Sequence, residues 1–357
     1  MLKRVRKNAS RIAAVFSAVA LVAALTMGLV GCGGGQSTSS GNVAKPEKIV
    51  FAWEPSNSGS DYEGMRDSMA KAITEATGIP CEVMTTTDYN MTIEALSSGQ
   101  AQIASLGADE YVEIHDRNPD INVAFVLSDK EGKLNPVSYY SQIICRDGEQ
   151  SKYLKADGSF DYDKLKGEDY SFVSLSSTSG YVIPATIFAQ KLNYDNIDVF
   201  AESGEFFNKV VMASSQPLSV YQVASSNVNL ASCDNTSASA AYNVVSGTNG
   251  EVGCVYEVQS GLEGELADWA GARLTCIESY PVPAVPFCIN TSALPKEVVD
   301  QIIDYMTSDA VASNTDIFVD PDNPAHKSKY KQSTGKVRFV VADDSYYDDY
   351  RNLIGKK

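Results

Sequence analysis

Histidine is scarce in this sequence, because only His115 and His326 occur among its 357 residues. The two lie far apart in the chain, each among polar neighbours. The HExxH, CxxC and GxSxG patterns and the P-loop pattern do not occur. The local signatures of zinc proteases, dithiol oxidoreductases, α/β-hydrolases and nucleotide hydrolases are therefore missing, although a triad assembled from distant residues stays open. These absences favour a binding protein over an enzyme.

Cations are also scarce, since 29 lysines and arginines face 45 aspartates and glutamates and give a net charge of −16. Five of the cations lie in the first eleven residues, and without them the chain carries −21. Such a surface disfavours nucleic acid and anionic lipid as partners. An anionic ligand would have to be held by local dipoles, because the overall field repels it.

The N-terminus is basic and leads into an apolar run. "MLKRVRKNASR" holds the five cations, and "IAAVFSAVALVAALTMGLV" follows. This arrangement predicts a secretory signal peptide over residues 1–31. The ending "LVGC" resembles a bacterial lipobox, which implies cleavage before Cys32 and a lipid on its sulfur. A flexible Gly/Ser/Thr-rich tether over 32–47 favours this reading over an uncleaved anchoring helix.

Six further cysteines follow Cys32 along the chain. In an extracytoplasmic protein they permit up to three disulfides, and the alternative is buried thiols that pack as small apolar side chains. Both alternatives are open from the sequence. The six are Cys81, Cys145, Cys233, Cys254, Cys276 and Cys288.

The body of the chain, about 310 residues, exceeds one ordinary core and predicts two lobes. Short β-rich runs alternate with helical ones from residue 48 to 128, which predicts an α/β fold around a mainly parallel sheet. A helix is expected over 62–78, ending at Gly78, and another over 204–215. The acidic and aromatic run at 343–350 predicts a solvated end face rather than a metal site. The segment 320–330 lacks the glycine and glutamate of a calcium loop, and we interpret it as an ordinary loop.

The run "SLSSTSGYVIP" (174–184) places several hydroxyls where a predicted strand turns into a helix. The first amides of a helix lack internal partners and form an anion site. Ser177, Thr178 and Ser179 add hydroxyl donors, and Gly180 would let the backbone approach a ligand. We expect this turn to hold a tetrahedral oxyanion without a cation. The alternative is simple helix capping by one hydroxyl.

The motifs resemble one family. "LSSTSGYVIP" is similar to the STSGY signature of the phosphate/phosphite/phosphonate substrate-binding proteins of ABC importers (PhnD-like). "TDYNMTIEALSSGQAQIASLGADEY", "SYYSQII" and "ESYPVPAVPF" resemble further segments of that family in the expected order. The resemblance implies an α/β, two-lobed periplasmic-binding-protein-like fold (type II), hinged by two crossover strands. Lobe 1 would comprise 48–140 plus 281–357, and lobe 2 would comprise 141–280.

The resemblance also implies ligand-binding residues. Ser177, Thr178 and Ser179 would bind the phosphoryl oxygens, and Tyr89 and Tyr139 would line the cleft. The alternative for both tyrosines is ordinary aromatic packing.

The sequence departs from the family at three positions, which would contact the end of the ligand opposite its phosphoryl group. Members that bind aminoethylphosphonate use a histidine and two acids, and this sequence has Gly204, Ser237 and Val285 at the positions matched to them. Glu205 and Asp234 stay as candidate acceptors, the alternative being surface acids. A carboxylate acceptor would favour a ligand that still carries a proton.

Together these features predict a lipid-anchored extracytoplasmic substrate-binding protein of an ABC importer. It would capture a small phosphorus oxyanion (phosphonate, phosphite or phosphate) between its lobes and deliver it to the permease and ATPase complex. We expect a monomer with no cofactor, no metal and no nucleic acid partner. Two alternatives are open: the same fold could bind a sulfonate or carboxylate, or the cleft could belong to an extracytoplasmic hydrolase or transferase.

Overall fold

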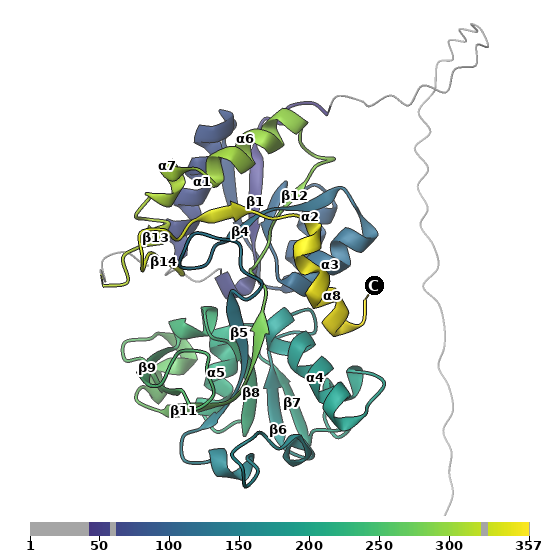
Figure 1. The fold of residues 1–357 in the computed structure, drawn as a ribbon, viewed down its shortest axis with the longest axis vertical. Coiled ribbons are helices and arrows are strands. Elements are labelled where there is room, and N and C mark those ends of the chain that lie inside the picture. Colours follow the sequence, from purple (N-terminus) through teal and green to yellow (C-terminus); the bar gives the residue numbers. More distant parts are fainter. Residues whose placement is uncertain (1–42, 58–61, 323–327, 357) are drawn as a thin grey trace, which may run out of the picture. The chain divides into compact units, whose positions relative to one another are not determined.

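Two β-sheets form the framework of the fold, which is seen here in a computed structural model (Figure 1). The structure describes residues 43–57, 62–322 and 328–356. The predicted signal peptide, Cys32, most of the tether and His326 lie outside the described residues.

The first sheet has the strand order β15-β4-β12-β3-β1-β2. β1 pairs in parallel with β2 and β3, whereas β12 runs antiparallel between β3 and β4. The strands are β1 Ile49–Trp53, β2 Cys81–Thr85, β3 Ile103–Ser105, β4 Ile121–Leu127, β12 Phe287–Asn290 and β15 Phe339–Val341.

The second sheet has the order β7-β6-β8-β5-β11-β10-β9. In this sheet β6, β7 and β8 are mutually parallel, whereas β5 pairs antiparallel with β8. The mainly parallel sheet predicted from residues 48–128 is the first one, where β1, β2 and β3 are parallel and the pairs of β12 and β15 are antiparallel. Its strands are β5 Tyr139–Arg146, β6 Asp169–Phe172, β7 Lys209–Met212, β8 Leu230–Asp234, β9 Tyr242–Ser246, β10 Val255–Val258 and β11 Arg273–Val282. β13 (Phe318–Val319) and β14 (Tyr330–Lys331) form a separate parallel pair.

Helices cover both sheets. The helices are α1 Glu63–Thr77, α2 Tyr89–Ser97, α3 Ala108–Arg117, α4 Ile183–Leu192, α5 Gln216–Ala224, α6 Lys296–Met306, α7 Asp309–Ala312 and α8 Asp348–Ile354. α1 buries Met65, Met69 and Ile73, whose spacing places them on one face. It ends at Gly78, whose φ of +68° suits a residue without a side chain, as predicted.

The helix predicted over 204–215 is wrong. That segment contains a turn at Gly204, with φ +86°, followed by β7 beside β6. Val210 and Val211 are β-branched and favour the extended strand.

Two paired strands connect the halves of the fold. β5 and β11 run antiparallel over eight residue pairs, from Leu274 opposite Arg146 to Val282 opposite Tyr139. Figure 1 shows both strands leading from the half built on the second sheet toward the other half. This arrangement confirms the two-lobed fold with two crossover strands.

The C-terminal segment forms hydrogen bonds with the two chain segments that connect the halves. The Tyr346 hydroxyl donates to the Asn135 carbonyl at 2.7 Å and accepts the Ala284 N–H at 2.9 Å. Tyr347 donates to the Ala284 carbonyl at 2.9 Å and is fully buried. The prediction that 343–350 is only a solvated end face is therefore wrong, because its tyrosines are structural.

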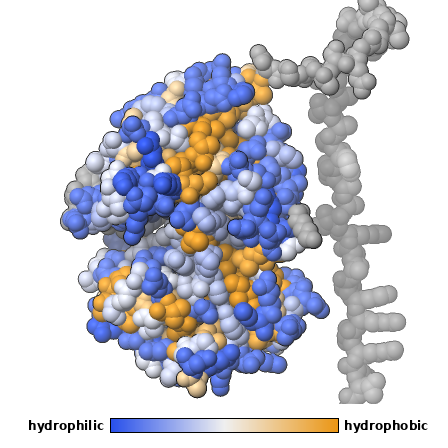
Figure 2. Space-filling view, in the orientation of Figure 1, coloured by the Kyte–Doolittle hydropathy of each residue, from blue (hydrophilic) through white to orange (hydrophobic). Residues whose placement is uncertain are grey.

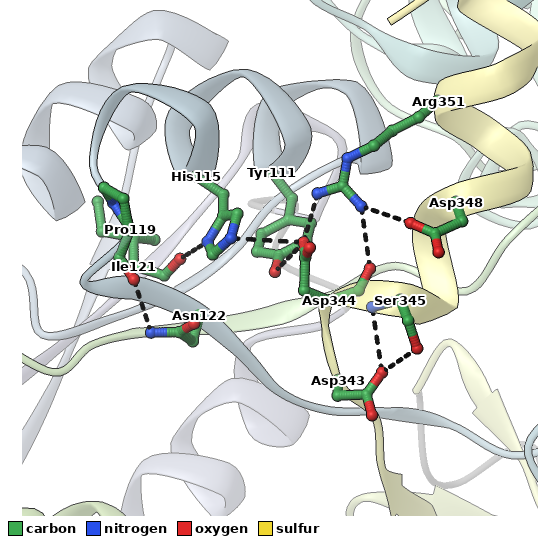
Figure 3. A network of polar contacts seen from close by, with 10 residues as sticks. All are labelled: Tyr111, His115, Pro119, Ile121, Asn122, Asp343, Asp344, Ser345, Asp348 and Arg351. Carbon is green, nitrogen blue, oxygen red and sulfur yellow. Dashed lines mark hydrogen bonds and ion pairs between the residues drawn. The ribbon is translucent and has the colours of Figure 1, made fainter. Parts of the chain in front are cut away.

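A polar network joins this segment to α3 (Figure 3). Asp344 accepts hydrogen bonds from Tyr111 at 2.9 Å and from the Arg351 guanidinium. His115 lies 3.6 Å from the same carboxylate and also contacts the Ile121 carbonyl at 2.7 Å. The network positions α8 against α3 through a partly buried ion pair.

All six cysteines after Cys32 are free thiols, so the structure favours the buried-thiol alternative over disulfides. Burial raises the pKa of Cys145 to about 12, which keeps this thiol protonated and unreactive. Within the described residues, no helix is both long enough and apolar enough to cross a membrane.

Hydrophilic residues cover most of the face drawn in Figure 2, with hydrophobic areas between them. Val341 of β15 and Val244 and Val245 of β9 are exposed on the edge strands of the two sheets.

Candidate ligand-binding site

A small cavity of about 30 Å³ lies where the carboxyl ends of strands from both sheets meet. Glu54 follows β1, Gly107 follows β3 and Asp234 ends β8, so the cavity occupies the usual ligand position of α/β sheets. Its lining residues are Glu54, Ser56, Tyr89, Gly107, Glu110, Tyr139, Ser177, Thr178, Ser179, Gln216, Asp234, Ser237, Val285 and Lys329.

Two wider hollows of about 480 and 490 Å³ each share a lining residue with the small cavity. Tyr89 is common to the cavity and the first hollow, and Lys329 is common to the cavity and the second. The polar side chains of the sequence motif converge on the small cavity, so we place the candidate site there.

Gln216 orients two motif hydroxyls. Its Nε2 lies 3.5 Å from Ser177 Oγ and 3.3 Å from Ser179 Oγ, and its Oε1 accepts the Asp234 N–H at 2.8 Å. Ser177 Oγ also accepts the Gly180 N–H at 3.3 Å. Because these oxygens accept from Gln216, each hydroxyl hydrogen is left to donate elsewhere. Ser177 is therefore a helix cap, as the simpler alternative predicted, and also a donor at the cavity.

Thr178 has a different role from its two neighbours. Its Oγ1 accepts the backbone N–H of Asp109 at 2.9 Å and donates to Glu110 Oε2 at 3.3 Å. Both partners lie at the start of α3, whose cap residue Gly107 has no side chain. Thr178 thus supplies that helix with a cap from the opposite half of the fold.

Gly180 is buried but does not line the cavity. A Cβ at this position would lie 2.4 Å from Cγ2 of Val173, so the glycine permits close packing behind the turn. The turn itself begins at Thr178, and Pro184 lies in the first turn of α4. The expected strand-to-helix turn is confirmed. Gly180 permits packing behind the turn, and its approach to a ligand stays a prediction.

The two tyrosines predicted for the cleft both line the cavity. Burial raises the pKa of Tyr89 and of Tyr139 well above the usual value, which keeps both phenols protonated and able to donate. Tyr89 hydrogen-bonds with the Ser56 hydroxyl, and Tyr139 with the Ser179 hydroxyl.

Asp234 lines the cavity with one carboxylate oxygen engaged. Oδ1 accepts the N–H groups of Thr236 at 2.8 Å and Ala238 at 3.0 Å. These bonds orient the side chain at the end of β8.

Two glutamates that the sequence analysis did not single out also reach the cavity. Glu54 Oε1 accepts the Gly107 N–H at 2.9 Å, and burial raises the pKa of Glu54 to about 8. Burial, and then the neighbouring Glu54, raise the pKa of Glu110 well above its usual range. Both side chains are therefore held toward their neutral form.

The cavity also contains a cation. Lys329 lies before β14, and burial lowers its pKa, while Asp234 and Glu54 oppose that effect. The expectation of a site without a cation is thus incomplete, and the loop predicted over 320–330 contributes to the site through Lys329.

Of the positions matched to the family's histidine and acids, Ser237 and Val285 line the cavity, whereas Gly204 does not. Glu205 is exposed and is not brought to the cavity. Glu205 was a candidate because it lies next to the position matched to the family's histidine. The strand of this segment ends at Met212, and α5 then places Gln216 at the cavity.

Some of the missed residues carried a signal. Glu54 directly follows β1, so the strand-end rule could have found it, and Glu110 lies in the first turn of the helix that follows β3. The helix wrongly predicted over 204–215 ended just before Gln216, so the prediction did not place Gln216 at the start of a helix. Lys329 lies in a segment without a recognisable pattern. In the described part of the chain, no group of three or more His, Cys, Asp and Glu side chains is arranged to hold a metal ion.

Comparison with known proteins gives a match to one family model. The model of the family described as "ABC transporter, phosphonate, periplasmic substrate-binding protein" matches residues 51–347. A comparison with curated proteins gives no match.

Solved structures with the same fold are distant in sequence. A binding protein component of an ABC phosphonate transporter from Pseudomonas aeruginosa has a TM-score of 0.60 and 18% identity, covering 87% of this chain and 86% of its own. PhnD1 from Prochlorococcus marinus, in complex with methylphosphonate, has a TM-score of 0.59 and 12% identity, covering 87% and 97%. A Xanthomonas citri protein bound to ATP has a TM-score of 0.52 and 14% identity, covering 87% and 96%. These likenesses concern the fold.

Proposed function

The chain belongs to the family of periplasmic substrate-binding proteins of phosphonate ABC transporters, and we propose that it captures a small phosphorus oxyanion in the cavity between its two halves. Members of this family are transporter components rather than enzymes, and they act with a permease and an ATPase. The proposal concerns the ligand, the residues that hold it and the attachment to the membrane.

One observation carries the proposal. Gln216 lies against both Ser177 Oγ and Ser179 Oγ, so the two hydroxyls have their hydrogens left for a ligand. The first backbone amides of the turn add further donors, and the phenols of Tyr89 and Tyr139 line the same cavity, each hydrogen-bonded to a serine hydroxyl. Several donors that converge on one buried point suit the oxygens of a tetrahedral anion.

The size of the cavity supports a small ligand. A volume of about 30 Å³ holds roughly two water molecules, because each needs about 10–15 Å³. Even a small oxyanion would require the cleft to widen slightly, and a nucleotide would require far more. Methylphosphonate, the ligand of the Prochlorococcus marinus relative, is among the smallest compounds of the proposed class.

Closure of the cleft follows from the same proposal. We assign residues 48–140 and 281–357 to one lobe and residues 141–280 to the other, with β5 and β11 as the hinge strands. Ligand binding would draw the motif hydroxyls of the second lobe toward Tyr89 and Glu54 of the first.

The proposed membrane attachment is a lipid on Cys32 after removal of residues 1–31. The lipobox-like "LVGC" and the tether that follows support it. Mass spectrometry of the protein purified from membranes tests it, because a diacylated N-terminal Cys32 is expected, and an unmodified chain that begins before residue 32 would contradict it.

Isothermal titration with methylphosphonate, phosphite and phosphate tests the ligand. The wild-type protein should bind at least one of these, and Ser177→Ala and Ser179→Ala should each weaken the binding about tenfold or more. Ser176→Ala is the matched control, because its hydroxyl pairs with Ser174 outside the cavity. The proposal would be overturned if the protein bound methanesulfonate or a carboxylate and bound none of the three phosphorus compounds.

A further inference from the structure

Glu110 places an unsatisfied polar atom at the cavity. The side chain is fully buried, and its Oε1 has no hydrogen-bond partner among the described residues. An unpaired buried polar atom is costly, and its usual explanation is an unseen partner. Because Glu110 lines the cavity, a bound ligand is the natural partner of this atom.

The two oxygens of Glu110 are not equivalent. The Thr178 hydroxyl accepts the Asp109 N–H, so its hydrogen is directed to Glu110 Oε2. Oε2 is therefore an acceptor, and Oε1 is the oxygen that can carry a hydrogen. Gly107 makes this arrangement possible, since a Cβ there would lie 2.0 Å from Oε2.

The charges around the cavity oppose an ionised Glu110. Glu54, Glu110 and Asp234 line the cavity, and Lys329 is the one cation among the described lining residues. Three ionised carboxylates would leave two negative charges in excess where an anion has to bind. Asp109, next to Glu110 in α3, adds a further carboxyl group, and burial also raises its pKa.

The other titratable groups that face Glu110 are neutral. Tyr89, Tyr139, Tyr350 and Cys288 approach it from four different elements, and burial raises the pKa of each. None of them supplies a positive charge that would stabilise a second carboxylate. Burial and Glu54 together raise the pKa of Glu110, in agreement with this geometry.

We propose that Glu110 is a protonated carboxyl group at neutral pH, whose Oε1–H donates a hydrogen bond to an oxygen of the bound oxyanion. This inference rests on the proposed function and adds a ligand-binding residue to it. The hydroxyls of Ser177 and Ser179 would hold the anion from one lobe, and Glu110 would hold it from the other. Because Glu54 is also held toward its neutral form, Lys329 would then offset the carboxylate of Asp234, which leaves the site nearly neutral before the anion enters.

Glutamine and alanine at position 110 separate this role from that of an ionised carboxylate. Glutamine reproduces the protonated form, because its amide oxygen can accept from Thr178 while its NH₂ group donates to the ligand. Glu110→Gln should therefore bind methylphosphonate within about tenfold of the wild type, whereas Glu110→Ala should lose about tenfold or more. Glu82→Gln is the control, because Glu82 is exposed and pairs with Lys48 at the surface.

Infrared difference spectroscopy reports the proton directly. At pH 7 the wild type and Glu82→Gln should show carbonyl stretches of protonated carboxyl groups that shift when methylphosphonate is added. Glu54 lines the same cavity and is also protonated at this pH, so the band of Glu110 is the one that persists in Glu54→Gln and is missing in Glu110→Gln. If Glu110→Gln does not fold, a shift that persists in Glu54→Gln tests the inference.

Each outcome bears on a separate claim. If the wild type binds methylphosphonate but no protonated carboxyl band responds, or the responding band is lost in Glu54→Gln and persists in Glu110→Gln, the inference is overturned and the proposed function stands. Loss of binding in Glu110→Gln as complete as in Glu110→Ala also overturns it. If the wild type binds none of methylphosphonate, phosphite and phosphate, the proposed function fails and the inference with it.

Discussion

The side-chain oxygen of Thr178 accepts a hydrogen bond from the backbone N–H of Asp109 at 2.9 Å, although the two residues belong to opposite halves of the fold. The contact supplies the N-terminus of α3 with the cap that Gly107 lacks. Thr178 also donates to Glu110, so one hydroxyl joins the oxyanion motif to the facing helix. A residue of the signature motif thus links the two halves directly.

Thr178→Val should favour a more open arrangement of the two halves. Valine keeps the shape but leaves the Asp109 N–H and Glu110 Oε2 without a partner, at a cost of about 1–3 kcal/mol for each buried group. Small-angle X-ray scattering should record a larger radius of gyration for the variant than for the wild type. Thr178→Ser, which keeps the hydroxyl, should scatter like the wild type. Identical scattering from the valine variant would mean that this contact does not hold the halves together.

Gln216→Leu should weaken ligand binding, although Gln216 is not one of the residues proposed to contact the ligand. The amide orients Ser177 and Ser179, and without it the two hydroxyls are free to turn away from the cavity. Loss of this orientation should reduce affinity for methylphosphonate about tenfold, as measured by titration calorimetry. Gln222→Leu on the same helix is the matched control, because its side chain pairs with Asn227. Equal affinities of the two variants would argue against the positioning role of Gln216.

Glu54 should make the protein less stable as the pH rises. Burial raises its pKa from 4.5 to about 8 in the folded state, so the folded protein binds a proton that the unfolded chain releases. The resulting stabilisation is present in full below about pH 4.5 and is lost as the pH rises through about 8. Urea unfolding should give Glu54→Gln an advantage on the order of a few kcal/mol at pH 9 that disappears near pH 5. A pH-independent difference between the two proteins would contradict the protonated state of Glu54.

Arg351→Ala should destabilise the fold more than a surface arginine does. Arg351 is mostly buried and binds both the side chain and the carbonyl of Asp344, which also accepts from Tyr111. Its removal should cost about 1–3 kcal/mol in urea unfolding, because hydrogen bonds to charged groups are strong. Arg117→Ala, which removes an exposed pair with Glu113, should cost less than about 0.5 kcal/mol. Similar losses in both variants would show that the network in Figure 3 does not stabilise the C-terminal segment.

Much of the fold could be predicted from short-range patterns. The apolar spacing of 62–78 and the glycine after it gave the bounds of α1 nearly to the residue. The alternation of strands and helices before residue 128 matched the first half of the fold. The second half departed more, because β9, β10 and β11 form consecutive antiparallel pairs and β11 also pairs with the distant strand β5.

The candidate site could be predicted only where a short motif marks the residue in the sequence. Ser177, Ser179, Tyr89, Tyr139 and Asp234 lie in motifs and reach the cavity together. The remaining partners come from separate segments that tertiary packing brings together. Lys329 is the clearest example, because a lysine in a polar loop has no sequence feature that indicates burial beside two carboxyl groups.

The C-terminal tyrosines illustrate the same limit. Acidic neighbours suggested a solvated face for 343–350, yet Tyr347 and Tyr350 point inward, and Tyr350 donates to Asp109 at 3.0 Å. The aspartates between them stay at the surface. The acidic residues of the segment correctly indicated a solvent-exposed side, but they gave no indication that its tyrosines are buried.

A crystal structure of the protein with methylphosphonate tests the central claim most directly. The account predicts phosphonate oxygens within hydrogen-bonding distance of Ser177 Oγ, Ser179 Oγ and Glu110 Oε1, with Thr178 still bound to α3. A ligand bound in either of the two wider hollows, away from the three predicted contacts, would contradict it.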